Sequence, residues 1–375
     1  MDKGERKVKK VLHILPMNQL SGAEKMALLI CKNLTQYESI VVTGGEVLKE
    51  VFESNGIQSY SLNFSKKKLW STIKQLHQII NINQVGLLHA HDNTASLIAY
   101  LTKRIYRLKV KIISHIHNCY PWLEEDSLNK KIDRYLRPKF DFNIACGKRV
   151  YDYYVEYAPY FEKDKTLILS NAMDLNEIQT YKEQELQQLK GKYRLKNEDF
   201  IIGFIGRLSE QKGLIPFIYE LANVKNQFIG CKFLIVGCGE QEEAIRDLVT
   251  TLQLTELFVF TGFQANVYPF YQLIDLFFLP SLYEGLPMVL LEAMAYGKPV
   301  VSMNVGSISE VLNEENGRLI EAGDTVNFVE ALRLLKSQYE ICQELGIKAK
   351  QEIKERFNIT KYNEQLVNLY REVEA

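Results

Sequence analysis

This sequence of 375 residues is short of several features that would define other classes of protein. No apolar run approaches the roughly 18 to 20 residues that a membrane span requires. The apolar stretch near the start, residues 11–16, is too short for a signal peptide and is predicted to form a first buried strand. The six cysteines are scattered without a C-x-x-C pair, which argues against a disulfide framework or a zinc site. A reducing cytoplasm fits this composition.

Net charge is also absent, because 46 Lys and Arg balance 46 Asp and Glu. The balance hides an asymmetry: residues 1–170 hold 26 basic against 17 acidic side chains, whereas residues 171–375 hold 20 against 29. A basic first half, with clusters at residues 66–68 and 103–111, can lie on an anionic membrane surface or meet an anionic ligand. The alternative is a solvated charged face together with attraction between the two halves.

Short apolar runs alternate with helix-length segments along the whole chain. Six such runs occur in the first half and six in the second, with a polar, strand-free segment between them at residues 176–198. This alternation is typical of parallel sheets that are covered by helices on both faces. The sequence therefore predicts an α/β protein with two Rossmann-like domains facing a cleft. We expect one domain at 1–175, a second at 176–357, and a closing helix at 358–375 that packs back toward the first.

The segment GFIGRLSEQKG follows a predicted strand of the second half. It places Arg207 and Lys212 just beyond the strand end, where ligands bind in such sheets. An arginine offers a planar fork and a lysine a point charge, so the two can converge on a diphosphate. Cations on loops are usually only solvated, and it is the position at a strand end that favours a binding site here.

Two carboxylates eight positions apart flank a turn in SLYEGLPMVLLEAMAYG, residues 281–297. Glu284 precedes Gly285 and Leu286, and a helix is predicted to begin just after them, with free amide groups that favour phosphate. Glu292 falls about one and a half turns inside that helix, among apolar neighbours, so its carboxylate needs a partner. The pair are candidates for binding a sugar and a ribose; the alternative is an exposed loop residue and a polar-face residue.

These motifs resemble those of a known family. GRLSEQKG, SLYEGLPMVLLEAMAYGKPVVS with its E-x7-E spacing, and NVGSISEVL with NGRLIEAGD are similar to the retaining GT-B glycosyltransferases of family 4, the glycosyl transferases group 1 proteins. In the first half, LSGAEKMALLICKNL resembles the family's Gly-rich loop, LLHAHD and IISHIHN its His-bearing strand ends, and LSNAMDL its Asn-Gly-x-Asp hinge. The chain departs from the pattern at Ser21, Ala172 and Ser307, where glycine is usual, and no departure removes a charged group.

The resemblance implies a role for each matching position. Arg207 and Lys212 would bind the donor diphosphate, Glu292 the ribose and Glu284 the hydroxyls of the donor sugar. The domain at 176–357 would then bind the nucleotide sugar, and the domain at 1–175 would form the acceptor side. The expected donor site is Gly22, Arg207, Lys212, Gly285, Leu286 and Glu292, and the expected catalytic residues are His117 and Glu284.

The acceptor side is expected to involve histidines and aromatic residues. All six histidines fall in the first half, and most are expected to be structural. His117 is taken as functional through the resemblance, and His89 and His91 are candidates for lining the acceptor side. In NCYPWLEEDS, Tyr120 and Trp122 could stack on a sugar face or equally pack beneath a lid.

By this resemblance the reaction moves a hexosyl group from a nucleotide sugar, with a UDP-sugar expected, to a hydroxyl with retention. No Asp-x-Asp occurs, so a metal-bridged diphosphate is not supported, and Arg207, Lys212 and the helix start would neutralise the leaving group. We expect same-face substitution through an oxocarbenium-like state in which the departing phosphate oxygen takes the acceptor's proton. No cofactor, metal or nucleic acid is expected.

The combination of SHIHN, ACGKRV and PSLYEGLP resembles bacterial exopolysaccharide or capsule enzymes, which extend a lipid-linked oligosaccharide at the inner face of the cell membrane. The basic first half suits such a peripheral setting. The alternatives are a glycolipid or teichoic-acid glycosyltransferase and a non-catalytic sugar-nucleotide-binding protein. A Rossmann dehydrogenase would need G-x-G-x-x-G after its first strand, where this chain reads LPMNQLSGAE.

Overall fold

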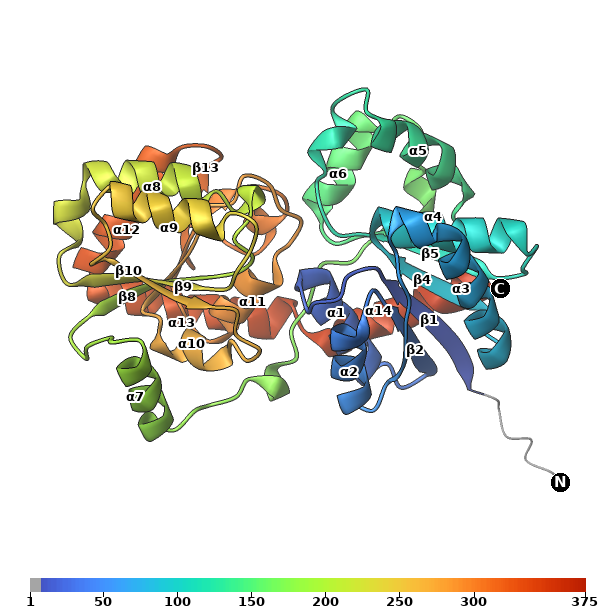
Figure 1. Cartoon of the computed structure of the whole chain (residues 1–375), viewed down its shortest axis with the longest axis horizontal. Coiled ribbons are helices and arrows are strands. Elements are labelled where there is room, and N and C mark those ends of the chain that lie inside the picture. The colour runs from blue at the N-terminus through green and yellow to red at the C-terminus, as the bar shows by residue number, and fades with distance from the viewer. Residues whose placement is uncertain (1–7) are drawn as a thin grey trace. The chain divides into compact units, whose positions relative to one another are not determined.

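The computed structural model describes residues 8–375 and divides into two α/β units (Figure 1). Unit 1 runs to Ala172 and also takes in the end of the chain, Ile359–Ala375, whereas unit 2 is Met173–Asn358. Residues 1–7, which begin the expected N-terminal domain, lie outside the described residues. Across residues 8–375, every helix is too short or too polar to cross a bilayer.

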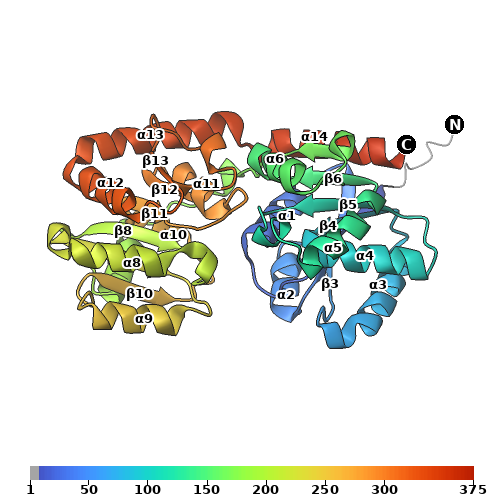
Figure 2. The same ribbon diagram turned by 90° about the horizontal axis from the view of Figure 1, so that it is seen from above.

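Unit 1 is built on a seven-stranded parallel sheet with the order β3-β2-β1-β4-β5-β6-β7, and helices cover it on both faces (Figures 1 and 2). The direction of winding reverses between β1 and β4. The strands are β1 (Lys9–Leu15), β2 (Tyr37–Thr43), β3 (Gln58–Ser61), β4 (Leu87–His91), β5 (Lys111–Ile116), β6 (Phe142–Ala145) and β7 (Thr166–Ile168). The helices are α1 (Gly22–Asn33), α2 (Glu46–Ser54), α3 (Leu69–Asn83), α4 (Asp92–Ile105), α5 (Leu128–Leu136), α6 (Lys148–Tyr157) and α14 (Ile359–Glu374).

The two faces of this sheet carry different side chains, because successive residues of a strand point to opposite faces. On one face Leu12, Leu88 and Ile112 pack against apolar side chains of α3 and α4. The intervening positions, His13 and His89 among them, point to the other face, where Tyr370 of α14 lies against His89. One face is therefore an apolar core, and the other buries a run of histidines.

Unit 2 is built on a six-stranded parallel sheet with the order β10-β9-β8-β11-β12-β13, which is the strand order of a Rossmann fold. The strands are β8 (Phe200–Ile205), β9 (Cys231–Val236), β10 (Phe258–Gly262), β11 (Leu276–Leu279), β12 (Val300–Asn304) and β13 (Arg318–Glu321). The helices are α7 (Glu183–Lys192), α8 (Leu214–Asn223), α9 (Glu242–Thr251), α10 (Tyr268–Leu273), α11 (Met288–Ala295), α12 (Thr325–Ser337) and α13 (Tyr339–Arg356).

The core of unit 2 is rich in aromatic rings. Phe217 of α8 packs against Phe233 of β9 and Phe278 of β11, with ring centroids 5.6 and 4.8 Å away. Such rings bury a large apolar area and prefer tilted contacts of this kind. The expected α/β class with two parallel sheets is confirmed, and the closing helix is present as α14, with Leu366 and Tyr370 fully buried.

Candidate active site

In unit 2 the direction of winding reverses between β8 and β11, and ligands bind at the carboxyl ends of the strands beside such a reversal. β8 leads directly to Arg207, and β11 leads to Glu284. Gly213 lets the two loops meet, because its φ is +65° and a Cβ there would lie 2.1 Å from the backbone oxygen of Pro280. Only glycine tolerates that conformation and that approach. The loops after β8 and β11 are therefore in contact at the reversal.

Lys212 and Glu284 form a largely buried ion pair at this point. Lys212 Nζ lies 2.6 Å from Glu284 Oε1, and the two side chains are 13% and 6% exposed. Gln211 donates from Nε2 to the carbonyl oxygen of Tyr283 at 2.9 Å and to Glu284 Oε2 at 3.3 Å. Burying two charges is costly unless their geometry is good and further hydrogen bonds satisfy them. The arrangement holds an ammonium group and a carboxylate in fixed positions at the end of the sheet where a ligand is expected.

Arg207 stands apart from that pair. Its Nε lies 2.9 Å from Glu240 Oε2, and both side chains are more than half exposed. Exposed ion pairs contribute little to stability, so the guanidinium can exchange Glu240 for another anion at small cost.

Glu292 lies inside α11 and is 1% exposed. The partner that its burial requires is Tyr271 of α10, whose hydroxyl donates to Glu292 Oε2 at 2.6 Å. Burial and the charge of Glu292 raise the pKa of Tyr271 well above its ordinary value, so the phenol keeps its proton and remains a donor. The Tyr296 ring stacks on Tyr271 with centroids 5.4 Å apart.

The start of α11 lies beside Glu284. The helix begins at Met288, and the carbonyl oxygen of Gly285 accepts the backbone N–H of Ser307 at 2.7 Å. Leu286 is buried, at 2% exposed. The predicted helix start just after Leu286 is therefore confirmed, and its first amide groups lie close in sequence to Glu284.

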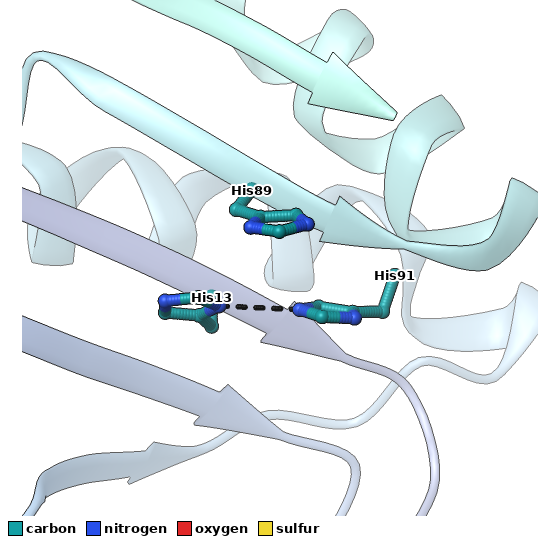
Figure 3. Close-up of side chains that lie close together, drawn as sticks. All are labelled: His13, His89 and His91. Atoms are coloured by element: carbon teal, nitrogen blue, oxygen red, sulfur yellow. Dashed lines mark hydrogen bonds between the residues drawn. The ribbon is translucent and has the colours of Figure 1, made fainter. Parts of the chain in front are cut away.

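Unit 1 has a reversal of its own, between β1 and β4, and buried histidines line it. His13 on β1 and His89 on β4 are register partners, and His91 lies two residues further along β4 (Figure 3). His13 Nδ1 is 3.1 Å from His91 Nε2, and His91 Nδ1 is 3.0 Å from His117 Nε2. His89 and His91 are 0% and 1% exposed, so neither expected acceptor contact has an open surface in this structure. His117 is partly exposed.

Tyr120 and Trp122 line a cavity of about 290 Å³ in unit 1, with ring centroids 5.4 Å apart and planes 21° from parallel. Asp92 also lines it, and its carboxylate accepts a hydrogen bond from the Tyr120 hydroxyl. Asp92 has a φ of +71°, a strained conformation for a residue other than glycine and one that occurs often at functional sites. Its charge acts on His117, whose pKa is nevertheless lowered because burial outweighs that charge. The cavity and His117 are therefore neighbours.

Gly22 is exposed and is the first residue of α1. Ser21 precedes it and donates its hydroxyl hydrogen bond to the carboxylate of Glu24, which is 2% exposed. Burial raises the pKa of Glu24. The contact between Ser21 and Glu24 therefore restrains the loop before α1, and the backbone of Gly22 is exposed to solvent.

Both halves of the chain match models of known families. Residues 20–177 match the model named Glycosyltransferase Family 4, and residues 186–352 match the model named Glycosyl transferases group 1. The chain belongs to glycosyltransferase family 4.

Curated relatives of this glycosyltransferase are similar over most of its length. The N-acetyl-alpha-D-glucosaminyl L-malate synthase of Bacillus anthracis is 27% identical over 304 residues, which cover 80% of this chain and 78% of that protein. The UDP-Gal:alpha-D-GlcNAc-diphosphoundecaprenol alpha-1,3-galactosyltransferase of Escherichia coli is 24% identical, with 96% of each chain covered. Among solved structures, HepE of Anabaena in complex with UDP-glucose is 21% identical and superposes with a TM-score of 0.85 over 97% of this chain and 99% of that one. The structural likeness supports the same fold.

The glycosyltransferase also holds polar residues at these sites that sequence reasoning missed. Gln211 contacts Glu284, Tyr271 contacts Glu292, and Asp92 contacts Tyr120. Gln211 and Asp92 each stand next to a predicted residue, Lys212 and His91, and that adjacency was the only sequence signal for them. Tyr271 lies in a short helix far from the motif, and nothing in the sequence indicates its contact.

Proposed function

We propose that this glycosyltransferase moves a hexosyl group from a UDP-sugar to a hydroxyl of a lipid-linked oligosaccharide, with retention and without a metal ion. The observation that carries the proposal is the largely buried Lys212–Glu284 pair at the reversal between β8 and β11. Two relations support it: HepE is known with bound UDP and UDP-glucose, and the E. coli relative is named for a diphosphoundecaprenol-linked acceptor. A further relative is a capsular polysaccharide enzyme of Staphylococcus aureus.

On the donor side, each group has one task. Lys212 and Arg207 balance the charge of the diphosphate, with the amides at the start of α11 and the backbone of Gly285 and Leu286 as further donors. Glu292 accepts from the ribose hydroxyls, and Tyr271 keeps its carboxylate oriented. Lys212 and Glu292 are held by their protein partners before the donor binds, and such preorganisation is how charge stabilisation becomes effective in the transition state.

Glu284 is the sugar-binding carboxylate. Its Oε1 is paired with Lys212 and its Oε2 with Gln211, so the group is anchored at both oxygens and can still accept from a sugar hydroxyl through a remaining lone pair. As the bond from the anomeric carbon to phosphate breaks, the carbon gains positive charge and the phosphate oxygen gains negative charge. Same-face attack lets that oxygen take the acceptor's proton, so no separate base is required. His117 contacts the sugar, and Gly22 approaches the phosphates with its backbone alone.

On the acceptor side, the cavity beside Tyr120 and Trp122 is proposed to receive the saccharide. Aromatic rings bind the apolar faces of sugars, and Asp92 and Asn129, which line the same cavity, bind hydroxyls. The cavity lies next to His117 through Asp92. We therefore propose this cavity of unit 1, beside His117, as the saccharide subsite.

The membrane surface is proposed to meet α5. Leu128, Ile132 and Tyr135, at helical spacing, are 72%, 37% and 61% exposed, and Lys130, Lys131 and Arg134 lie between them. An apolar stripe with basic flanks is what an interfacial helix presents to anionic lipid. Asn129 and Ile132 of the same helix line the acceptor cavity, so a lipid anchor in the membrane and its saccharide in the cavity are compatible. This setting is the cytoplasmic face of the cell membrane.

The double variant Leu128→Ser and Tyr135→Ser should bind anionic phosphatidylglycerol vesicles about tenfold less tightly than the native chain, because two exposed apolar side chains are lost. Ile82→Ser is the matched control, since Ile82 is 77% exposed on α3, outside the proposed surface. Vesicle co-sedimentation at low salt measures both. If the native chain fails to sediment, or the control loses as much binding as the double variant, the membrane assignment does not hold.

The reaction itself is tested by supplying UDP-, GDP- and dTDP-sugars with and without a polyprenyl-diphosphate saccharide. Slow hydrolysis of one donor, faster turnover with the acceptor and an unchanged anomeric configuration by NMR are expected. An inverted product would refute the retaining mechanism, and full activity only after addition of a divalent cation would refute metal independence. Binding of a donor without turnover on any acceptor would favour a non-catalytic sugar-nucleotide-binding protein, and turnover only with a glycolipid or a teichoic acid would favour the other acceptor class.

A further inference from the structure

Five of the six histidines of the chain gather on one face of the unit 1 sheet. They alternate along three neighbouring strands, so they share the face that is opposite to the α3 and α4 core. Their rings form one contiguous cluster in which neighbouring centroids are 3.9 to 5.4 Å apart. The five are His13 on β1, His89 and His91 on β4, His115 on β5, and His117, which directly follows the end of β5 at Ile116.

Hydrogen bonds between ring nitrogens divide the five histidines into two separate series, which we call the first and second hydrogen-bonded chains. In the first, His13 Nδ1 is 3.1 Å from His91 Nε2, and His91 Nδ1 is 3.0 Å from His117 Nε2 (Figure 3 shows the contact between His13 and His91). In the second, the Tyr370 hydroxyl is 2.6 Å from His89 Nδ1, and His89 Nε2 is 3.1 Å from His115 Nδ1. The first chain alone reaches His117 and the cavity beside it.

A metal ion does not suit this arrangement, although two groups of three histidine nitrogens lie within 4.8 Å of one another in the described residues. A metal bonds to the lone pair of a ring nitrogen, and this lone pair lies in the plane of the ring. Each group contains a stacked pair: His89 and His91 are 12° from parallel with centroids 4.4 Å apart, and His115 and His117 are 28° from parallel at 3.9 Å. Rings stacked in this way cannot direct their lone pairs at one point, so the geometry favours hydrogen bonding.

The directions of the pKa shifts favour a neutral ring at each position of the first chain near pH 7. Burial lowers the pKa of His13 to about 3 and holds the pKa of His91 well below its ordinary value; it also lowers that of His117. A neutral imidazole has one N–H and one bare nitrogen, so each bond in the chain needs a donor on one side and an acceptor on the other. The proton must therefore be on the equivalent nitrogen in all three rings, either Nδ1 in each ring or Nε2 in each ring.

His13, at the buried end of this hydrogen-bonded series of rings, decides between the two proton arrangements. His13 Nε2 is buried and has no hydrogen-bond partner among residues 8–375. A buried N–H without an acceptor is rarer in proteins than a buried acceptor without a donor, so the bare nitrogen belongs at Nε2 and the proton at Nδ1. His13 then donates to His91, His91 donates to His117 Nε2, and His117 carries its own proton on Nδ1.

We propose that the chain from His13 through His91 fixes His117 as a neutral imidazole with its proton on Nδ1, so that His117 offers a hydrogen-bond donor to a saccharide oxygen and does not act as a base. His13 and His91 are positioning residues in this scheme. The donor role of His117 rests on the proposed function, whereas its protonation pattern does not. A donor at this position agrees with a reaction in which the leaving phosphate takes the acceptor's proton.

The test uses the full chain with ¹⁵N-labelled histidine, because long-range ¹⁵N–¹H spectra report which ring nitrogen holds the proton. In the native protein, His13, His91 and His117 should all carry it on Nδ1. His91→Asn places an amide donor where Nδ1 was and should preserve the His117 pattern. His91→Leu removes the donor and should leave His117 as a mixture of tautomers, with kcat about 10- to 100-fold lower and little change in the KM for the donor.

His77→Asn is the control, since His77 stacks on Tyr106 outside the cluster. If His91→Leu does not fold, His13→Leu removes the first donor of the same hydrogen-bonded chain. It should likewise leave His117 as a mixture of tautomers. A native His117 with its proton on Nε2, an unchanged pattern in the Leu variants, or zinc that copurifies with the native chain and is lost in His91→Leu would overturn the proposal. If no sugar transfer is found at all, the spectra still decide the protonation pattern, so the two failures are distinguishable.

Discussion

Replacing Lys212 with Met should lower kcat/KM for sugar transfer by about 100- to 1000-fold, the loss expected when one preorganised charge-stabilising donor is removed. Lys212 Nζ is 2.6 Å from Glu284 Oε1 and is the less exposed of the two cations proposed to bind the diphosphate. The same change leaves the Glu284 carboxylate buried without its partner, so stability should fall by about 3 to 5 kcal/mol. Steady-state kinetics and urea unfolding measure the two effects.

The double variant Lys212→Met and Glu284→Gln separates these causes. It removes both charges, so most of the stability should return while activity stays low. Lys348→Met is the matched control, because it breaks an exposed pair with Glu344 on α13 and should change neither measurement. A double variant that regains activity together with stability would show that Lys212 serves the fold and not the reaction.

Acidification from pH 7 to pH 5 should unfold unit 1 selectively. Burial holds the pKa of His13 near 3, and the pKa values of His89, His91 and His115 well below 6.5. Below pH 6.5 the unfolded chain therefore binds protons that the folded chain does not, so stability is complete above about pH 6.5 and falls as the pH decreases. Each such histidine costs about 1.4 kcal/mol per pH unit in that window. The sum reaches several kcal/mol by pH 5.

Unit 2 is an internal control, because it contains no histidine. Thermal unfolding at pH 7.5, 6.0 and 5.0 should show one transition that moves to lower temperature and one that moves little. The raised pKa of Glu24 opposes the histidines, but this single carboxyl cannot offset several rings. His13→Leu should reduce the pH dependence by about one proton. Two transitions that shift equally would contradict the assignment.

The sequence predicted the sheets more completely than the sites. Twelve strands lie where apolar runs were found, and the missed one is β3, Gln58–Ser61, which forms the edge of the unit 1 sheet. An edge strand is buried on fewer sides, and QSYS accordingly lacks the apolar run that marks a central strand. The start of α11 was predicted because proline and a following apolar run are local signals.

Local sequence patterns did not show which side chains of different elements contact one another. Glu292 was expected to need a partner, but only the packing of α10 on α11 shows that it is Tyr271. His89 and His91 were expected to line an acceptor site, and the structure buries both. His89 contacts Tyr370 of α14, a helix more than 260 residues later in the chain. Spacing along a strand shows which face a side chain takes, and not what covers that face.

By itself, the sequence determined the α/β class, two parallel sheets and the family. The reason is that apolar periodicity and the motifs around Arg207, Lys212, Glu284 and Glu292 each consist of contiguous residues. Only the tertiary structure decided that Lys212 pairs with Glu284 while Arg207 does not, and that His13, His91 and His117 form one chain of hydrogen bonds. The physical reason is that parallel strands distant in sequence end at the same edge of a sheet. The register between those strands sets which side chains meet.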